Sequence, residues 1–121
     1  MPMTHRIDVR KGTWESISCG LKPLLVHIDD RIFTRFSEGD TVRIHSGSSH
    51  KICTCELLAM RRYKSLDELL EKEDLTKIAH GGHNEARNYL LQIYKRLPEH
   101  YIFVVLEIKL LSVGRKKIST G

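Results

Sequence analysis

The fold of this chain is decided by residues 14–40, which read WESISCGLKPLLVHIDDRIFTRFSEGD. Trp14 and Ile17 fall on one face of a short helix, for which Thr13 supplies a capping hydroxyl and Gly20 a natural stop. An extended apolar run follows, and a polar link ending in Gly-Asp then opens another strand. The stretch therefore predicts a helix, a buried strand, a turn and a second strand, in that order.

Strand patterns surround this segment in the first half of the chain. Thr4 to Val9 alternate polar and apolar residues, which indicates a half-buried strand. Leu24 to Ile28 are nearly all apolar, as in a strand that is buried on both faces. The polar link leads into a strand at Thr41–His45, and a loop rich in serine and glycine returns the chain as a long strand at Lys51–Met60.

The second half of the chain predicts two helices and a final strand. Ser65 is followed three residues later by Glu68, which is the capping box of a helix with a leucine stripe. Asn84 can cap a longer helix, which Pro98 ends. Tyr101 to Leu111 then form a strongly apolar strand, so the whole pattern indicates an α+β fold on a small curled sheet or barrel.

The length and composition predict one domain. A chain of 121 residues with 40% hydrophobic and 29% charged content can bury a single ordinary core. We place the domain at residues 1–111 and interpret residues 112–121 as a basic, frayed tail. Much of the net charge of +5 comes from this tail, which contains Arg115, Lys116 and Lys117.

Several classes of protein do not fit the sequence. No apolar run approaches the roughly 20 residues needed to span a bilayer, and residues 1–10 lack the apolar block of a signal peptide. Three cysteines, with Cys53 and Cys55 one residue apart, indicate reduced thiols in a cytoplasmic protein. Their spacing is too short for a zinc knuckle, and His80 and His83 lack a third ligand nearby, so we expect no metal. Without a phosphate loop or dinucleotide fingerprint, we expect no cofactor, and we expect no membrane partner.

Short motifs along the chain resemble those of a known family. Gly20-x-Lys22 precedes the apolar strand, Gly39-Asp40 opens the next one, and Tyr63 lies two residues before the helix cap. This order resembles the ASCH domain, a member of the PUA-like barrel group, over about residues 5–111. The other residues that carry the resemblance are Ser65, Leu66, Leu69, Leu70, Glu71, Tyr94 and the final apolar strand. The resemblance implies a small PUA-like β-barrel of about five to six strands with two to three helices.

The chain departs from the family at its polar centre. ASCH domains usually carry Gly-x-Lys-x-x-Glu-x-Arg, a polar cluster that faces the cleft between barrel and helices. Here Leu25 stands at the Glu position and His27 at the Arg position, so Lys22 and a titratable imidazole remain. The Tyr-Gly pair that often opens the last strand of the family is Tyr101-Ile102 in this chain, so close approach of the backbone there is not expected.

The resemblance implies two kinds of function, binding or hydrolysis. Most ASCH and PUA-like domains are thought to bind RNA or modified nucleosides, whereas one branch hydrolyses the acetyl amide of N4-acetylcytidine with a Lys, a Thr and a Glu. The Lys maps onto Lys22, the Thr onto Leu25, and the Glu onto the loop around Ala79, where no carboxylate is present. An amidohydrolase would therefore need another acid, since paired groups must act together. The candidates for that acid are Asp29, Asp30 and Glu85.

The expected function is binding of RNA or a modified nucleoside through a cleft around Lys22 and His27. Arg61 and Tyr63 share one face of a strand and Arg62 the other, so the arginines can contact phosphates. Tyr63 can stack a splayed base or pack beneath the following helix, and Tyr101 is a second stacking candidate.

Two alternatives stay open. Lys22 and His27 could move protons in metal-free RNA cleavage, because an imidazole near a lysine can act on a phosphodiester. In the second alternative, a degenerate ASCH cleft lined by the apolar run Leu24-Leu25-Val26 binds a protein partner.

Overall fold

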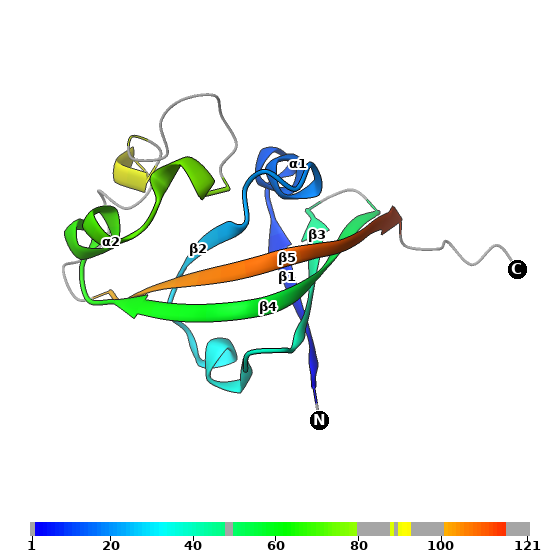
Figure 1. The fold of residues 1–121 in the computed structure, drawn as a ribbon, viewed down its shortest axis with the longest axis horizontal. Coiled ribbons are helices and arrows are strands. Elements are labelled where there is room, and N and C mark those ends of the chain that lie inside the picture. Colours follow the sequence, from blue (N-terminus) through cyan, green and yellow to red (C-terminus); the bar gives the residue numbers. More distant parts are fainter. Residues whose placement is uncertain (1, 48–49, 80–87, 89, 93–100, 116–121) are drawn as a thin grey trace, which may run out of the picture.

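The computed structural model of this protein describes residues 2–47, 50–79, 88, 90–92 and 101–115. Five strands form the frame of the described chain, and short helices lie in several of the connections between them (Figure 1). The elements are β1 (Thr4–Val9), α1 (Lys11–Ser18), β2 (Leu24–Ile28), the 3-10 helix η1 (Arg31–Arg35), β3 (Thr41–Ser46), β4 (Lys51–Tyr63), α2 (Leu66–Lys72), the 3-10 helix η2 (Leu75–Lys77) and β5 (Phe103–Arg115).

The strands form one curled sheet in the order β1-β3-β4-β5-β2. β1 pairs with β3 in parallel, and the other neighbouring strands are antiparallel. The two edge strands, β1 and β2, are consecutive strands in the chain. α1 connects them at one end of the curled sheet (Figure 1). This five-stranded half-barrel with short helices confirms the predicted small α+β fold.

Side chains are buried on both faces of β2, which explains its continuous apolar sequence. Leu25 lies on the inner face and packs in the core that contains Trp14 and Ile44. Leu24 lies on the outer face, in a second cluster with Leu69 of α2. The alternation of a strand places neighbouring residues on opposite faces, so both clusters depend on β2.

Most predicted boundaries hold, and the exceptions have local causes. The Ser65 side chain accepts from the Glu68 N–H, which confirms the predicted cap of α2. Gly20 has φ 77°, a left-handed conformation that favours glycine, directly after the C-cap of α1. Thr13 does not cap α1, because the helix begins at Lys11 and Thr13 is buried within it. η1 was not predicted, and its helical turn begins where the side chain of Asp30 accepts from the N–H of Arg31.

The last strand corrects the predicted end of the domain. β5 extends to Arg115, and residues 112–115 pair with residues 51–54 of β4. Residues 112–115 therefore belong to the sheet and not to a frayed tail, because the long strand β4 gives them a partner. Residues 116–121 lie outside the described residues, as do Asn84, Pro98 and the loop with His80 and His83.

The turn before β3 is built around the buried carboxylate of Asp40. Gly39, at φ 92°, adopts the left-handed conformation that this turn requires. Asp40 accepts hydrogen bonds from the backbone N–H groups of Met3 and Ser37, each at 3.0 Å, and its Oδ2 lies 2.7 Å from Nε2 of His5. The hydrogen bond with His5 is the main reason that the pKa of Asp40 falls from 3.8 to about 2, and those from the backbone lower it further.

Asp40→Asn is expected to make the fold less sensitive to acid. A carboxylate whose pKa is lowered in the folded state stabilises that state fully above its unfolded value of 3.8, and this stability is lost as the pH falls towards about 2. Urea unfolding of the wild type and of Asp40→Asn between pH 6 and pH 2 measures the effect. The difference in stability between the two proteins should shrink over the acidic end of that range. A constant difference would show that Asp40 does not titrate in this way.

Candidate functional site

A cavity of about 420 Å³ lies where the open edges of the half-barrel approach each other. Its walls combine the end of β1, the first turn of α1 and the middle of β2. The lining residues are Asp8, Val9, Arg10, Thr13, Leu25, Val26, His27, Gly47, Ala79 and Leu90. Apolar walls with a few polar groups are typical of pockets for small organic ligands.

The two edge strands bring backbone polar groups to this cavity. The N–H of Ala79 donates to the carbonyl of Leu24 at 2.7 Å, so the backbone of Leu24 points away from β5. Backbone direction alternates along a strand, so that of Val26 points to the same open edge. On β1, the carbonyl of Val9 accepts from the N–H of Gly47 on the β3 side. The backbone N–H and carbonyl of Asp8 therefore point to the open edge. Val26 and Asp8 both line the cavity and can offer it one N–H and one carbonyl each.

His27 supplies the polar side chain of the β2 wall of this cavity. Its Nε2 is buried, and among the described residues it has no hydrogen-bond partner. Burial lowers the pKa of His27 from its ordinary value of 6.5, so the imidazole is neutral at pH 7. The Phe33 ring lies 5.7 Å from the imidazole between centroids and holds it from the core side. A buried polar atom without a partner is unusual in proteins and is readily satisfied by a water or a ligand.

Three cavity residues are those at which the ASCH resemblance places polar groups. Leu25 and His27 stand at the Glu and Arg positions of the motif, and Ala79 lies where the Glu of the hydrolytic branch falls. The structure brings all three to one cavity, although Leu25 and Ala79 are more than 50 residues apart in the sequence. At these three positions the cavity has one polar side chain, that of His27, and two apolar ones.

Lys22 is not among the described residues that line this cavity. Its amino group donates to the backbone carbonyl of Thr76 in η2, on the side of the sheet covered by α2. Hydrogen bonds from Thr76, together with the charges of Lys77 and Lys22, lower the pKa of Asp74. The expected pairing of Lys22 with His27 in one cleft is therefore not found, because Lys22 is turned towards η2.

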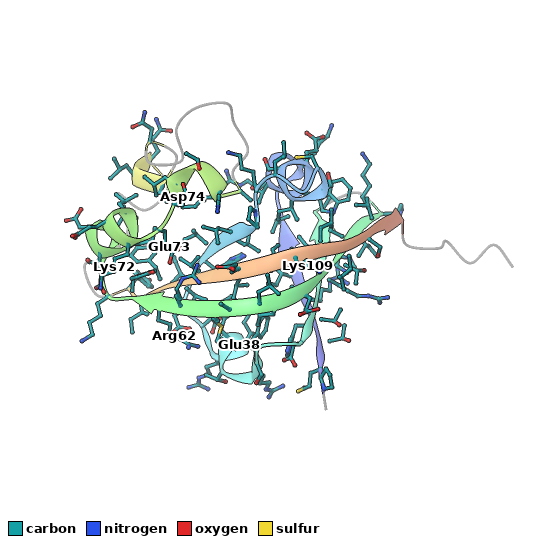
Figure 2. The ribbon with its side chains drawn as sticks, viewed as in Figure 1. Glu38, Arg62, Lys72, Glu73, Asp74 and Lys109 are labelled. Atoms are coloured by element: carbon teal, nitrogen blue, oxygen red, sulfur yellow. The ribbon has the colours of Figure 1, made fainter. Side chains whose placement is uncertain are left out.

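Arg61, one of the two predicted arginines, lies in a polar cluster on the outer face of the sheet. Its Nε and Nη2 donate to the two carboxylate oxygens of Glu73, at 2.6 and 2.8 Å, and its Nη1 donates to Glu107 at 3.1 Å. The Tyr63 hydroxyl donates to the same Glu73 carboxylate. Figure 2 shows Glu73 on the side of β4 that faces α2. Arg61 is thus bound in a fork by protein carboxylates and is not free to contact a phosphate.

The remaining predicted contacts are divided between the two faces of β4. Tyr63 is only 7% exposed and packs beneath α2, so it does not offer a ring to stack a base. Arg62 lies on the opposite face and donates to Asp29 at 3.1 Å and to the Phe33 carbonyl at 3.4 Å (Figure 2). Tyr101 is 39% exposed and lies outside the set of residues that line the cavity.

Two of the three acids proposed for an amidohydrolase are engaged elsewhere. Asp29 pairs with Arg62, and Asp30 caps η1 through its side chain. Glu85 lies outside the described residues. Asp8, the one carboxylate among the described lining residues, accepts from the Nε and Nη2 of Arg6, at 3.2 and 3.1 Å. The described cavity therefore lacks the lysine-carboxylate pair that the hydrolytic chemistry requires.

Of the residues considered in the sequence for a metal site, Cys53 and Cys55 lie within the described chain. The part of the chain that the structure describes holds no group of three or more His, Cys, Asp and Glu residues that could bind a metal. Cys53 and Cys55 are buried and free, and burial raises the pKa of their thiols to about 11 and about 12. The two cysteines are core residues, as predicted, because a thiol with so high a pKa is inert near neutral pH. Among the described helices, none has the length and apolar character to cross a membrane.

Comparisons with known proteins show the fold. The chain is similar to the hypothetical protein PH0355, known from a crystal structure, with a TM-score of 0.70 and 19% identity over 90% of this chain and 100% of the other. It is also similar to protein PF0455 of Pyrococcus furiosus, known from a solution NMR structure, with a TM-score of 0.63 and 22% identity over 91% of this chain and 99% of the other. Neither the family models nor the curated proteins give a match in sequence. At these identities, the two structures show that the chain shares their fold, and they give no information about its function.

Sequence reasoning missed the contribution of β1 and α1 to the cavity. Arg10 and Thr13 lie at the junction of the predicted strand and helix, and Asp8 is at the end of the strand. Their positions depend on the parallel pairing of β1 with β3, which closes the sheet towards β2. The signal in the sequence was weak, because a residue that follows a strand and precedes a helix is ordinarily a linker.

Proposed function

We propose that this chain is a divergent ASCH domain and that it binds a nucleoside, free or within RNA, in the cavity between β1 and β2. The observation that carries the proposal is the buried, unpartnered Nε2 of His27 in a cavity whose walls include Leu25 and Ala79. These are the positions at which the resemblance expects the ligand-binding cleft.

The chemistry of the lining favours a flat ring with polar edges. Leu25, Ala79 and Leu90 supply apolar contact, which suits the face of a base. The backbone groups of Val26 and Asp8 and the neutral imidazole of His27 supply hydrogen bonds at the edges. A neutral imidazole suits a neutral base, because one ring nitrogen can donate or accept without bringing a charge into the apolar cavity. A volume of about 420 Å³ is within the range of small-ligand pockets.

Binding is favoured over catalysis by the groups that the cavity holds. Lys22 is turned away, Leu25 replaces the nucleophile of the hydrolytic branch, and Ala79 replaces its acid. RNA cleavage by Lys22 and His27 loses its basis for the same reason, since the two groups do not line a common cavity.

His27→Leu is expected to weaken nucleoside binding about 5- to 10-fold, because it removes one buried hydrogen bond and keeps the apolar volume. Isothermal titration of the four ribonucleosides and N4-acetylcytidine into both proteins measures the affinities. His50→Leu is the matched control, since His50 is exposed and outside the lining. Unchanged affinity in His27→Leu, or no binding by the wild type of any nucleoside or its monophosphate, would contradict the proposed function.

A further inference from the structure

A second hollow adjoins the cavity and is markedly basic. Its volume is about 500 Å³, and it lies over the start of α1 and the loop after β3. The lining residues are Arg10, Lys11, Trp14, Glu15, Ser46, Gly47 and Lys51. Three cationic residues against one carboxylate favour an anionic ligand. These residues form what we call the basic hollow.

The cations of the basic hollow come from two parts of the chain. Arg10 and Lys11 lie at the junction of β1 and α1, and neither has an acidic partner within the described residues. Lys51 comes from the start of β4, and its Nζ lies 5.6 Å from the centroid of the Trp14 ring. The fold brings these cations together from separate elements. Neighbouring lysines in a solvated tail, in contrast, are close only because they are adjacent in the sequence.

The start of α1 adds to the preference for an anion. Arg10 is the N-cap, and its side chain makes no capping hydrogen bond. The first turn of α1 contains no acidic residue. The first backbone N–H groups of a helix lack partners within the helix, and its dipole favours negative charge there. The basic side chains and the backbone therefore favour the same class of ligand.

The cavity and the basic hollow are contiguous, since Arg10 and Gly47 line both. At Gly47, an added Cβ would meet the Val9 carbonyl at 3.6 Å, so the backbone of the two segments is close at this boundary. The N–H of Gly47 donates to the same carbonyl at 2.9 Å and fixes the distance between β1 and the loop after β3. A ligand that extends past Arg10 can thus contact both hollows at once.

We infer that the basic hollow binds a phosphate of the ligand whose base lies in the cavity. The ligand class is then a nucleotide, either a mononucleotide or a unit of an RNA strand, and not a free nucleoside. Arg10 has the central position, because it lines both hollows and can contact the phosphate beside the sugar. This inference rests on the proposed function, which requires only that the base binds.

The test compares a double variant with a charge-matched control. Arg10→Ala/Lys11→Ala removes two cations from the basic hollow, and Arg31→Ala/Arg35→Ala removes two exposed cations from η1, at the other end of the sheet from α1 (Figure 1). The probes are the four ribonucleosides with N4-acetylcytidine, their 5′- and 3′-monophosphates, and a ten-nucleotide single-stranded RNA. Titrations at two salt concentrations give affinities and their salt dependence.

The wild type should bind at least one monophosphate or the RNA about 10-fold more tightly than the matching nucleoside. Arg10→Ala/Lys11→Ala should abolish that advantage and reduce the salt dependence, so the affinity for the monophosphate or the RNA should fall about 10-fold more than that for the matching nucleoside, whereas the η1 variant should retain the advantage. Tighter binding of a monophosphate than of RNA identifies a mononucleotide, and the reverse order identifies a strand. If nucleosides and nucleotides bind equally and the double variant has no effect, the phosphate site is wrong and the proposed function stands. If no probe binds the wild type, both are wrong.

Discussion

Glu73→Ala is expected to destabilise the fold by about 2–4 kcal/mol, since it removes one partner of a buried ion pair. The Glu73 side chain is only 4% exposed, and it accepts from both Arg61 and Tyr63. Its removal leaves the Tyr63 hydroxyl buried without its acceptor. Arg61 retains Glu107 and partial contact with solvent, which keeps the loss below that of a fully buried pair.

Urea unfolding followed by circular dichroism at pH 7 measures this loss. Glu107→Ala is the matched control, because it removes a carboxylate from the same arginine at a position that is 38% exposed. We expect the control to cost about 0–1 kcal/mol. Equal losses in the two variants would show that burial of Glu73 does not determine the strength of the cluster.

The same cluster gives the fold a dependence on acid. Burial alone would raise the pKa of Glu73, but hydrogen bonds from Arg61 and Tyr63 outweigh it and lower the pKa below its ordinary value of 4.5. The stabilisation by Glu73 is therefore complete above that value and is lost as the pH falls through the lower, folded-state pKa. Acid should narrow the difference between the wild type and Glu73→Ala.

This cluster shows why part of the structure could not be predicted from the sequence. The pattern places Arg61 and Tyr63 on one face of a strand, and the structure confirms it. It does not show that a carboxylate at the end of α2 reaches both residues, or that the register of β4 with β5 brings Glu107 beside them. Such contacts depend on how elements pack, whereas periodicity and capping report only on each element by itself.

Sequence patterns predicted best those elements that a single physical requirement, such as burial or capping, determines. β1 and β2 have the predicted bounds, since the alternation in one and the continuous apolar run in the other reflect their burial. The Ser65 cap was predictable because the hydrogen bond lies within four residues. The cavity was only partly predictable: His27 was identified, but Asp8 and Arg10 line it only because the curled sheet brings β1 towards β2.

Replacing Trp14 with alanine should cost about 3–5 kcal/mol, because a large buried ring is removed from the core. Trp14 is 5% exposed, packs in the inner cluster and donates from its indole nitrogen to the Ile44 carbonyl at 3.1 Å. Its ring also lies beneath Lys51 in the basic hollow. One side chain thus joins α1 to β3 and supports the floor of the inferred phosphate site.

Trp14→Phe separates these contributions, since it keeps an aromatic ring and removes the hydrogen bond. We expect it to cost about 1–2 kcal/mol, because the Ile44 carbonyl loses its indole donor. Urea unfolding gives the stabilities, and titration of nucleosides and their monophosphates at a temperature where both variants are folded gives the affinities. Trp14→Ala should lose most of its preference for monophosphates, whereas Trp14→Phe should keep it. If Trp14→Ala stays folded and keeps that preference, α1 does not hold the phosphate site in place through this residue.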